Sequence, residues 1–231
     1  MSFACKKLVI ETQDKKLLDI SFDFDKSYAL IGQSGSGKSL TLKALLGMLP
    51  MELKSSLEFK APYELKRGVT LSMVPQNPFT ALSPLTKIKK QFFINSSLAQ
   101  EYISLVGLEE KVLERFPSEL SGGQLQRVII AMSLSIKPKL LLLDEPTTAL
   151  DKLSKESILK LIAKLQKRDN FDMLFVTHDI ATVKNLCQKI GIIKEGKILE
   201  EGDMDEVLSS PQDIYTKKLI NSGFENREFR R

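Results

Sequence analysis

The stretch LSGGQLQRVIIAMSLSIKPKLLLLDEPTTALD, residues 120–151, predicts a helix, a turn and a strand in immediate succession. Apolar residues recur at nearly helical spacing after Gly123, which is typical of an amphipathic helix. Residues 140–143 are four consecutive leucines between Lys139 and Asp144, a pattern typical of a strand buried on both faces of a parallel sheet. The unit favours an α/β fold.

The predicted helix begins at Ser121, Gly122 and Gly123. Glycines let the backbone approach a ligand closely, and the free amides and positive dipole end of a helix start favour an anion such as phosphate. An ordinary N-cap turn is the alternative, and the tripeptide alone does not decide between the two.

Two carboxylates, Asp144 and Glu145, follow the leucine strand, and Pro146 ends it. Ligands of open α/β sheets bind beyond the carboxyl ends of the strands, so this position suits a metal-linked acid beside a general base. A solvated acidic turn is the alternative, although acids directly after four leucines are costly unless they serve a ligand.

The sharpest motif matches the phosphate-binding loop pattern G-x-x-x-x-G-K-[ST]. It comprises Gly32, Gln33, Ser34, Gly35, Ser36, Gly37, Lys38 and Ser39. Its glycines let backbone amides wrap phosphates, while Lys38 is expected to reach the outer phosphates and the Ser39 hydroxyl to ligate Mg²⁺. A predicted strand, residues 28–31, precedes the loop, and leucines at helical spacing follow from Leu40. We therefore expect nucleotide binding here; a flexible Gly/Ser loop is the alternative.

Two further polar residues follow predicted strands. Gln76 comes after a strand expected within residues 68–74, where its amide oxygen would reach a bound metal; a turn glutamine is the alternative. His178, the single histidine of the chain, lies just past a strand expected at residues 173–176. That end of the sheet also carries Asp144 and Glu145, which favours a phosphate contact over a structural role.

The rest of the chain predicts a single domain, residues 1–231, with an inserted part. Residues 1–76 and 138–231 are expected to form a nucleotide-binding α/β core, which opens with short strands at residues 8–10 and 20–24. Residues 77–137 are expected to form a helical subdomain, in which three prolines between residues 75 and 84 preclude regular structure. A helix with Leu153 on its apolar stripe, a hairpin at residues 190–200 and a helical tail complete the prediction.

Composition limits the classes of function. The net charge of +5, from 34 basic and 29 acidic residues, is mild and dispersed, which argues against a nucleic-acid groove. No run approaches the roughly 20 apolar residues that cross a bilayer, so we expect a soluble chain that reaches a membrane only through a partner. The two cysteines, Cys5 and Cys187, match no metal spacing and suit a reducing cytosol.

In this order and spacing, the motifs resemble those of the ATP-binding subunit of ABC transporters, over nearly the whole chain. Residues 32–39 resemble the Walker A loop, Gln76 the Q-loop, residues 120–124 the LSGGQ signature, residues 140–145 the Walker B strand, Ala149, Leu150 and Asp151 the D-loop, and His178 the switch histidine. The resemblance implies a P-loop NTPase (RecA-like) core with an N-terminal antiparallel β region and an inserted α-helical subdomain.

The resemblance also implies cofactors, roles and partners. ATP and Mg²⁺ are expected, with Glu145, His178 and Lys38 as the catalytic residues. Binding of ATP would further use the loop residues with Leu40, Gln76, Ser121, Gly122, Gly123, Gln124 and Asp151, and binding of the metal would use Ser39, Gln76 and Asp144. The implied partners are a second copy or a paralogous ATPase subunit, transmembrane permease subunits and, indirectly, an extracytoplasmic substrate-binding protein. The chain itself is expected at the cytoplasmic face of the cell membrane, as a peripheral subunit.

Within the family, residues 74–84, 127–132 and 144–151 look like the oligopeptide, dipeptide and nickel importer branch. Residues 39–41 and 47–50 lean toward nickel import, with peptide import as the alternative. A soluble ABC ATPase of translation or DNA repair is a further alternative, although the chain lacks their tandem modules and long coiled-coil insert. One departure is the aromatic that the family places before the Walker A loop: its position falls near Thr12, which cannot stack on adenine.

Overall fold

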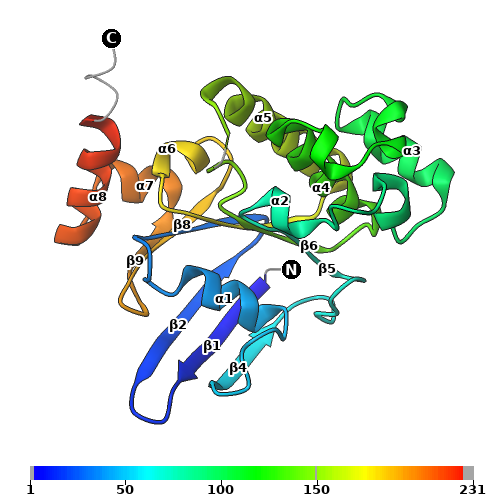
Figure 1. The fold of residues 1–231 in the computed structure, drawn as a ribbon. Helices are drawn as coiled ribbons and strands as arrows, with labels where there is room; N and C mark the ends of the chain where they lie inside the picture. The colour runs from blue at the N-terminus through cyan, green and yellow to red at the C-terminus, as the bar shows by residue number, and fades with distance from the viewer. Residues whose placement is uncertain (1–2, 149, 226–231) are drawn as a thin grey trace. The chain divides into compact units, whose positions relative to one another are not determined.

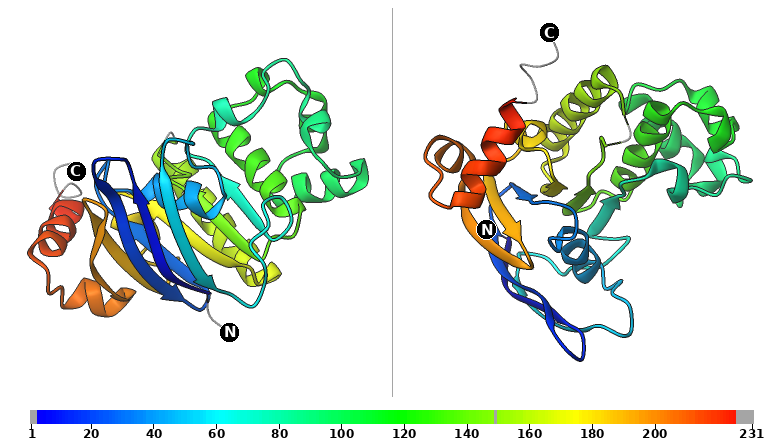
Figure 2. Two further views of the ribbon diagram at one scale, coloured as in Figure 1. Left: turned by 90° about the horizontal axis from the view of Figure 1, so that it is seen from below. Right: turned by 60° about the vertical axis from the view of Figure 1, so that its left-hand side comes forward.

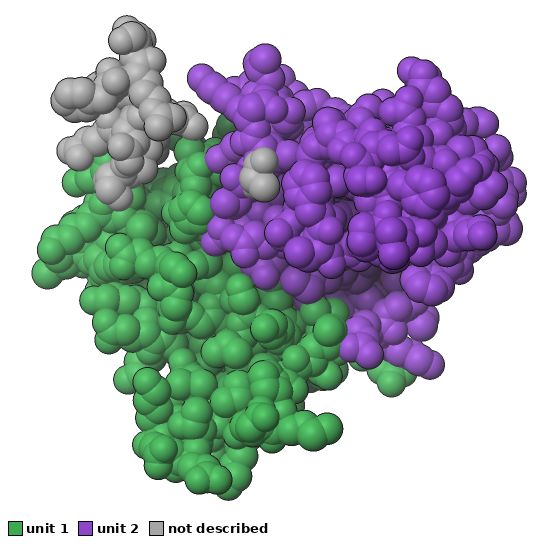
Figure 3. Space-filling model, in the orientation of Figure 1, with its two compact units in different colours: residues 1–65, 172–231 green, residues 66–171 purple. Residues whose placement is uncertain are grey.

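The computed structural model describes residues 3–148 and 150–225, with side chains through residue 221. The chain divides into two compact units, residues 1–65 with 172–231 and residues 66–171, coloured separately in Figure 3. The predicted helical insertion, residues 77–137, lies within the second unit, and its boundaries stay a prediction.

The first unit contains a three-stranded antiparallel sheet in the order β2-β1-β4 (Figure 1). Its strands are β1 (Phe3–Glu11), β2 (Lys16–Phe24) and β4 (Lys54–Lys60). Alternate residues of β2 are buried, and Phe22 and Phe24 join Phe3 and Tyr28 in one aromatic cluster with ring centroids 5.1 to 6.4 Å apart. This burial fixes the register, because a slip by one residue would turn the apolar side chains outward.

A second set of strands in this unit has the order β7-β3-β8-β9. The strands are β3 (Ser27–Ile31), β7 (Asp172–Thr177), β8 (Lys189–Lys194) and β9 (Lys197–Asp203). β3 pairs in parallel with β7 and β8, and all its residues are buried, as expected for a strand covered on both faces. β8 and β9 form the predicted hairpin.

The described residues of the first unit also include four helices (Figures 1 and 2). They are α1 (Lys38–Leu45), α6 (Ile180–Val183), α7 (Met204–Ser209) and α8 (Ile214–Glu225). α1 contacts β4 and β7, α7 contacts β8 and β9, and α6 contacts α8. The helical tail is therefore confirmed, and it packs on the hairpin and the short helix that follows β7.

The second unit has two parallel strands and mostly helical surroundings. β5 (Leu71–Val74) pairs in parallel with β6 (Leu140–Asp144). The α-helices are α2 (Pro78–Ala81), α3 (Ser96–Leu105), α4 (Gly122–Ser135) and α5 (Lys152–Asp169), and the 3₁₀ helices are η1 (Ile88–Gln91), η2 (Glu110–Glu114) and η3 (Pro117–Glu119). The expected class, α/β with an N-terminal antiparallel region and a helical part, is confirmed.

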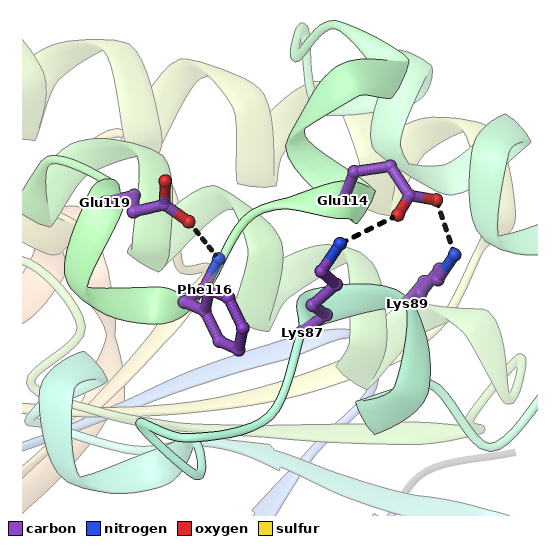
Figure 4. Close-up of polar contacts among 5 residues, drawn as sticks. All are labelled: Lys87, Lys89, Glu114, Phe116 and Glu119. Atoms are coloured by element: carbon purple, nitrogen blue, oxygen red, sulfur yellow. Dashed lines mark hydrogen bonds and ion pairs between the residues drawn. The ribbon is translucent and has the colours of Figure 1, made fainter.

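Figure 4 shows how the short connections of this unit are held. Lys87 and Lys89 both pair with Glu114, at 3.4 and 2.6 Å, and so join η1 to η2. The Phe116 amide donates to a Glu119 carboxylate oxygen at 2.7 Å at the start of η3. These contacts are exposed, so water competes with them and each contributes little to stability.

Two predictions are wrong in detail, and one strand was not predicted. The proline-rich segment does contain a helical turn, α2, because Pro78 occupies a first helical position that needs no N–H donor and the Asn77 side chain accepts from the Phe79 amide at 2.9 Å. Leu153 is 79% exposed, so the buried stripe of α5 begins at Ile158. β4 was not predicted, because its residues are mostly exposed and show no apolar alternation.

Among the described residues, no helix is both long and apolar enough to cross a bilayer.

Candidate functional site

The glycine-rich loop in the first unit connects β3 to α1. Gly35 and Gly37 take positive φ values of 80° and 112°, a region open to glycine at little cost. Gly37 is the N-cap of α1, no side chain caps that helix, and its first turn carries no acid. The positive end of α1 is therefore left for an external anion. Leu40 lies in the same first turn.

Lys38 is almost buried, with 5% of its surface exposed. Its ammonium donates to the carbonyls of Gly32 at 2.7 Å and Gln33 at 2.9 Å, so it lies over the loop it belongs to. The hydroxyl of Ser36 is buried and, among the residues that the structure describes, has no hydrogen-bond partner. A buried hydroxyl without a partner is costly, and a phosphate oxygen would satisfy it.

Two backbone hydrogen bonds join this loop to β7 and to the β8–β9 turn. The Gly32 amide donates to the Thr177 carbonyl at 3.4 Å, and the Gly196 amide in the β8–β9 turn donates to the Ser36 carbonyl at 3.0 Å. A Cβ at Gly32 would lie 2.2 Å from the Ile193 carbonyl oxygen, so only glycine fits there. The loop is thus fixed by backbone contacts at its start and its middle.

His178 follows β7 directly, and register explains where it lies. Thr177 pairs with Ile31, the last residue of β3 before the loop, so His178 and the loop start leave the same edge of the sheet. Asp179 caps α6, accepting from the Ala181 amide and the Thr182 hydroxyl at 2.9 Å each. The His178 side chain itself is exposed.

In the second unit, Asp144 is the last residue of β6 and is 8% exposed. Glu145 follows it at a φ of +43°, an uncommon conformation for a non-glycine residue that costs on the order of 1–3 kcal/mol. Its carboxylate accepts from the Gln76 amide at 3.5 Å and from the Thr148 hydroxyl at 3.0 Å. The predicted pair Gln76 and Glu145 therefore lies together, because Val74 of β5 pairs with Leu143 of β6.

The sequence analysis missed Thr148. It lies three residues after Glu145, where the turn brings its hydroxyl to the carboxylate, and its amide donates to the Glu145 carbonyl at 3.2 Å. A threonine at that spacing from an acid in a turn is the signal that would have found it.

Ser121 and Gln124 cap the start of α4. The Ser121 hydroxyl accepts from the Gln124 amide at 3.3 Å, and the Gln124 side chain accepts from the Ser121 amide at 3.0 Å. This capping box bears out the ordinary N-cap role for Ser121 and Gln124. The amides of Gly122 and Gly123 have no hydrogen-bond partner in the described part of the chain, so an anion can still bind them.

Asp151 caps the adjacent helix α5 by accepting from the Ser154 amide at 3.0 Å. Two hydrogen bonds lower the pKa of this carboxyl. The one from the Ser154 side chain has the larger effect, and the one from the Ser154 backbone amide has the smaller. Ser154 also neighbours the signature, because its hydroxyl lies 3.4 Å from a Cβ built on Gly123. Ala149, the first residue of the predicted D-loop, lies outside the described residues.

Arg127 is a further residue that the sequence analysis missed. One guanidinium nitrogen donates to the Val106 carbonyl, just after α3, and another donates to the Ser157 hydroxyl of α5 at 2.7 Å. With Ser121, Gly123 and Gln124 it lines a cavity of about 400 Å³. Its position one turn after the glycines is the signal that would have found it. No group of three or more His, Cys, Asp or Glu among the described residues is arranged to hold a metal.

The chain matches one family model and is similar in sequence to several known proteins. A family model described as ABC transporter matches residues 16–148. The chain is 37% identical to the peptidoglycan transport ATP-binding protein YejF of Agrobacterium fabrum, over 87% of this chain and 42% of that protein. It is 36% identical to the oligopeptide transport ATP-binding protein OppD of Bacillus subtilis, over 88% of this chain and 65% of that protein. It is 32% identical to the metal-staphylopine import system ATP-binding protein CntD of Staphylococcus aureus, over 91% of this chain and 88% of that protein.

The chain thus spans less than two thirds of the first two relatives and most of the third. Among solved structures, CbiO1 from Clostridium perfringens, described as part of the ABC transporter complex CbiONQ, superposes with a TM-score of 0.73 over 90% of each chain. At 24% identity this likeness shows the fold alone.

Proposed function

Because the chain belongs to the ABC transporter family, we propose that it is the ATP-hydrolysing subunit of an importer for peptides or chelated metal ions. The observation that carries the proposal is the phosphate-binding loop, whose helix start is uncapped and whose lysine is buried over the loop. Bound ATP with Mg²⁺ supplies the phosphoanhydride bond whose hydrolysis drives transport.

The loop residues have separate tasks in this proposal. The Lys38 ammonium leaves the carbonyls of Gly32 and Gln33 and binds the outer phosphates. The amides of Gly35 and Gly37, with the first turn of α1, neutralise phosphate charge. Hydrogen bonds at Gly32 and Ser36 hold the loop backbone before the nucleotide arrives, so of these groups only the Lys38 side chain has to reorient.

Glu145 is the proposed general base. Its carboxylate is oriented by Gln76 and Thr148, so it can accept a proton from an attacking water. The Gln76 amide nitrogen points to Glu145, which leaves its amide oxygen for a metal, together with the Asp144 carboxylate and the Ser39 hydroxyl. His178 is proposed to donate a hydrogen bond to the terminal phosphate.

We further propose that a second ATPase chain completes the site. Within the described residues, one chain offers two helix starts that suit an anion, at α1 and α4, but one phosphate-binding loop with a lysine. The Gly122 and Gly123 amides are therefore assigned to the nucleotide held by the partner, which is a second copy or a paralogue. Asp151 would lie at the same interface. The dimer would work at the cytoplasmic face of the membrane with permease subunits and an extracytoplasmic binding protein.

The substrate is the least determined part of the proposal. The names of the relatives refer to peptidoglycan, oligopeptide and metal-staphylopine transport. Residues 39–41 and 47–50 resemble the nickel-importing branch, so nickel, as an ion or a chelate, is the favoured substrate and a dipeptide the alternative. Nucleic acid is not an expected partner.

Uptake in cells that lack this chain tests the proposal. Labelled nickel, alone and with an opine-type chelator, and a labelled dipeptide would be compared after restoring either the intact chain or the Glu145→Gln variant. Loss of nickel uptake that only the intact chain restores supports nickel import, and loss of dipeptide uptake moves the assignment to peptides. If no uptake changes, the importer proposal is wrong.

A further inference from the structure

Tyr215 on α8 contacts the phosphate-binding loop directly. Its hydroxyl accepts a hydrogen bond from the backbone amide of Gln33 at 3.3 Å, across 182 positions of sequence. We propose that Tyr215 is a positioning residue that holds this loop ready for the nucleotide. The proposal rests on the proposed function, because it assumes that the loop binds ATP.

Hydrogen bonds at the start of α8 fix the position of Tyr215. Asp213 accepts from the Tyr215 amide at 2.7 Å and from the Thr216 amide at 3.4 Å, which fixes the first turn of α8. The Glu200 carboxylate on β9 accepts from the amides of Gln212 at 2.8 Å and Asp213 at 3.1 Å. The start of α8 is therefore anchored on the hairpin by charge-assisted hydrogen bonds, which are among the stronger ones.

The ring of Tyr215 is held as well as its hydroxyl. The Lys194 ammonium, from the end of β8, lies 5.3 Å from the ring centroid, within the range of a cation–π contact. The same hairpin contacts the loop through Gly196, whose amide donates to the Ser36 carbonyl. Loop, hairpin and α8 thus form one connected set of contacts in the first unit.

The peptide groups of Gln33 explain why this contact bears on nucleotide binding. Tyr215 holds the amide of Gln33, while Lys38 holds its carbonyl at 2.9 Å. When Lys38 turns to the phosphates, the carbonyl loses that bond and the Tyr215 contact remains. A loop held in its binding conformation gives up less freedom when the ligand arrives, so Tyr215 should strengthen ATP binding.

The test compares two tyrosine-to-phenylalanine variants of the full chain. Tyr215→Phe removes the hydroxyl that contacts the loop and keeps the ring over which Lys194 lies. Tyr63→Phe removes a hydroxyl that donates to Asp172 at 2.7 Å, in the same unit, and serves as the matched control. Each protein is assayed for the Kd of ATP, for kcat and KM, for Tm, and for hydrogen exchange at the Gln33 amide without nucleotide.

We expect Tyr215→Phe to raise the Kd and KM for ATP roughly three- to tenfold, the effect of one hydrogen bond, with kcat unchanged. Exchange at the Gln33 amide should become faster in this variant alone. Tyr63→Phe should lower Tm and leave the KM unchanged, because its hydroxyl bonds a buried carboxylate away from the loop.

The outcomes separate the two proposals. If the intact chain binds no ATP, both the proposed function and the role of Tyr215 are wrong. If the intact chain binds ATP, and Tyr215→Phe binds it equally well with unchanged exchange at Gln33, the positioning role alone is wrong. Equal increases of KM in both variants would likewise overturn it, because they would report general loosening.

Discussion

Replacing Gly196 by alanine tests how the β8–β9 turn supports the phosphate-binding loop. Gly196 has a φ of +76°, and a Cβ there would lie 2.1 Å from the carbonyl oxygen of Leu17 in β2. Its amide donates to the Ser36 carbonyl at 3.0 Å, and its carbonyl accepts from the Asp19 amide at 2.8 Å. An added methyl group must therefore displace the turn from both neighbours.

The expected cost has two parts. A left-handed conformation costs a non-glycine residue about 1–2 kcal/mol. Relief of the backbone clash would weaken two hydrogen bonds, each contributing about 0.5–1.5 kcal/mol. The Gly196→Ala variant should thus lose about 2–5 kcal/mol of unfolding free energy, a fall in Tm of roughly 4–20 °C for a chain of this size.

Gly47→Ala is the matched control. Gly47 also has a positive φ, of 64°, but a Cβ there meets no atom within 4 Å. The Gly47→Ala variant should lose only the conformational part of the unfolding free energy, about 1–2 kcal/mol, which lowers Tm by roughly 2–8 °C. Thermal unfolding and ATP titration of both variants supply the measurements, and only Gly196→Ala should weaken ATP binding, by about fivefold or more.

Equal falls in Tm for the two glycine variants would refute the argument that the backbone of Leu17 confines Gly196. A Gly196→Ala protein that is destabilised but binds ATP normally would show that the turn does not support the loop. Either result would remove this contact from the account of the site.

Three further predictions concern other parts of the chain. Glu145→Gln should keep ATP binding and reduce kcat about 10²–10⁴-fold, because the proton acceptor is lost; unchanged single-turnover hydrolysis would exclude Glu145 as the base. Arg127→Met should lower the unfolding free energy by about 1–3 kcal/mol, since the Val106 carbonyl and the Ser157 hydroxyl both lose their donor, and Ser157→Ala should cost less in the same urea titration. Partial desolvation of the carboxyl raises the pKa of Glu201 although the residue is exposed, so its ionisation opposes folding slightly, and stability falls as the pH rises from about 4.5 through the raised pKa. Glu201→Gln should therefore unfold at higher urea than the intact chain at pH 7.5, with the difference smaller at pH 4; a difference that does not depend on pH would contradict this.

The strongest sequence patterns predicted their elements well. The loop that ends in Lys38, the leucine strand before Asp144 and the helix after Ser121 all form where periodicity and motif chemistry placed them. These segments combine a buried apolar run with residues that serve one local geometry, so neighbours in sequence suffice to recognise them.

Apart from Thr148, whose partner Glu145 is three residues away, the features that were missed depend on partners distant in sequence or on an uncommon turn conformation. β4 carries few buried side chains and forms because it pairs with β1, as Leu57 does with Leu8. Its exposure leaves no alternation for a sequence pattern to detect. The Tyr215 contact joins α8 to the loop across most of the chain, and the orientation of Glu145 depends on a turn conformation that is rare for its residue type.

The most direct test of the central claim is the equilibrium affinity of the purified chain for ATP, measured by calorimetry for the intact protein and for Lys38→Met. The account predicts measurable binding by the intact chain and at least a tenfold loss in Lys38→Met, because the ammonium now held by the Gly32 and Gln33 carbonyls is assigned to the phosphates. No binding by the intact chain, or equal binding by both proteins, would contradict it.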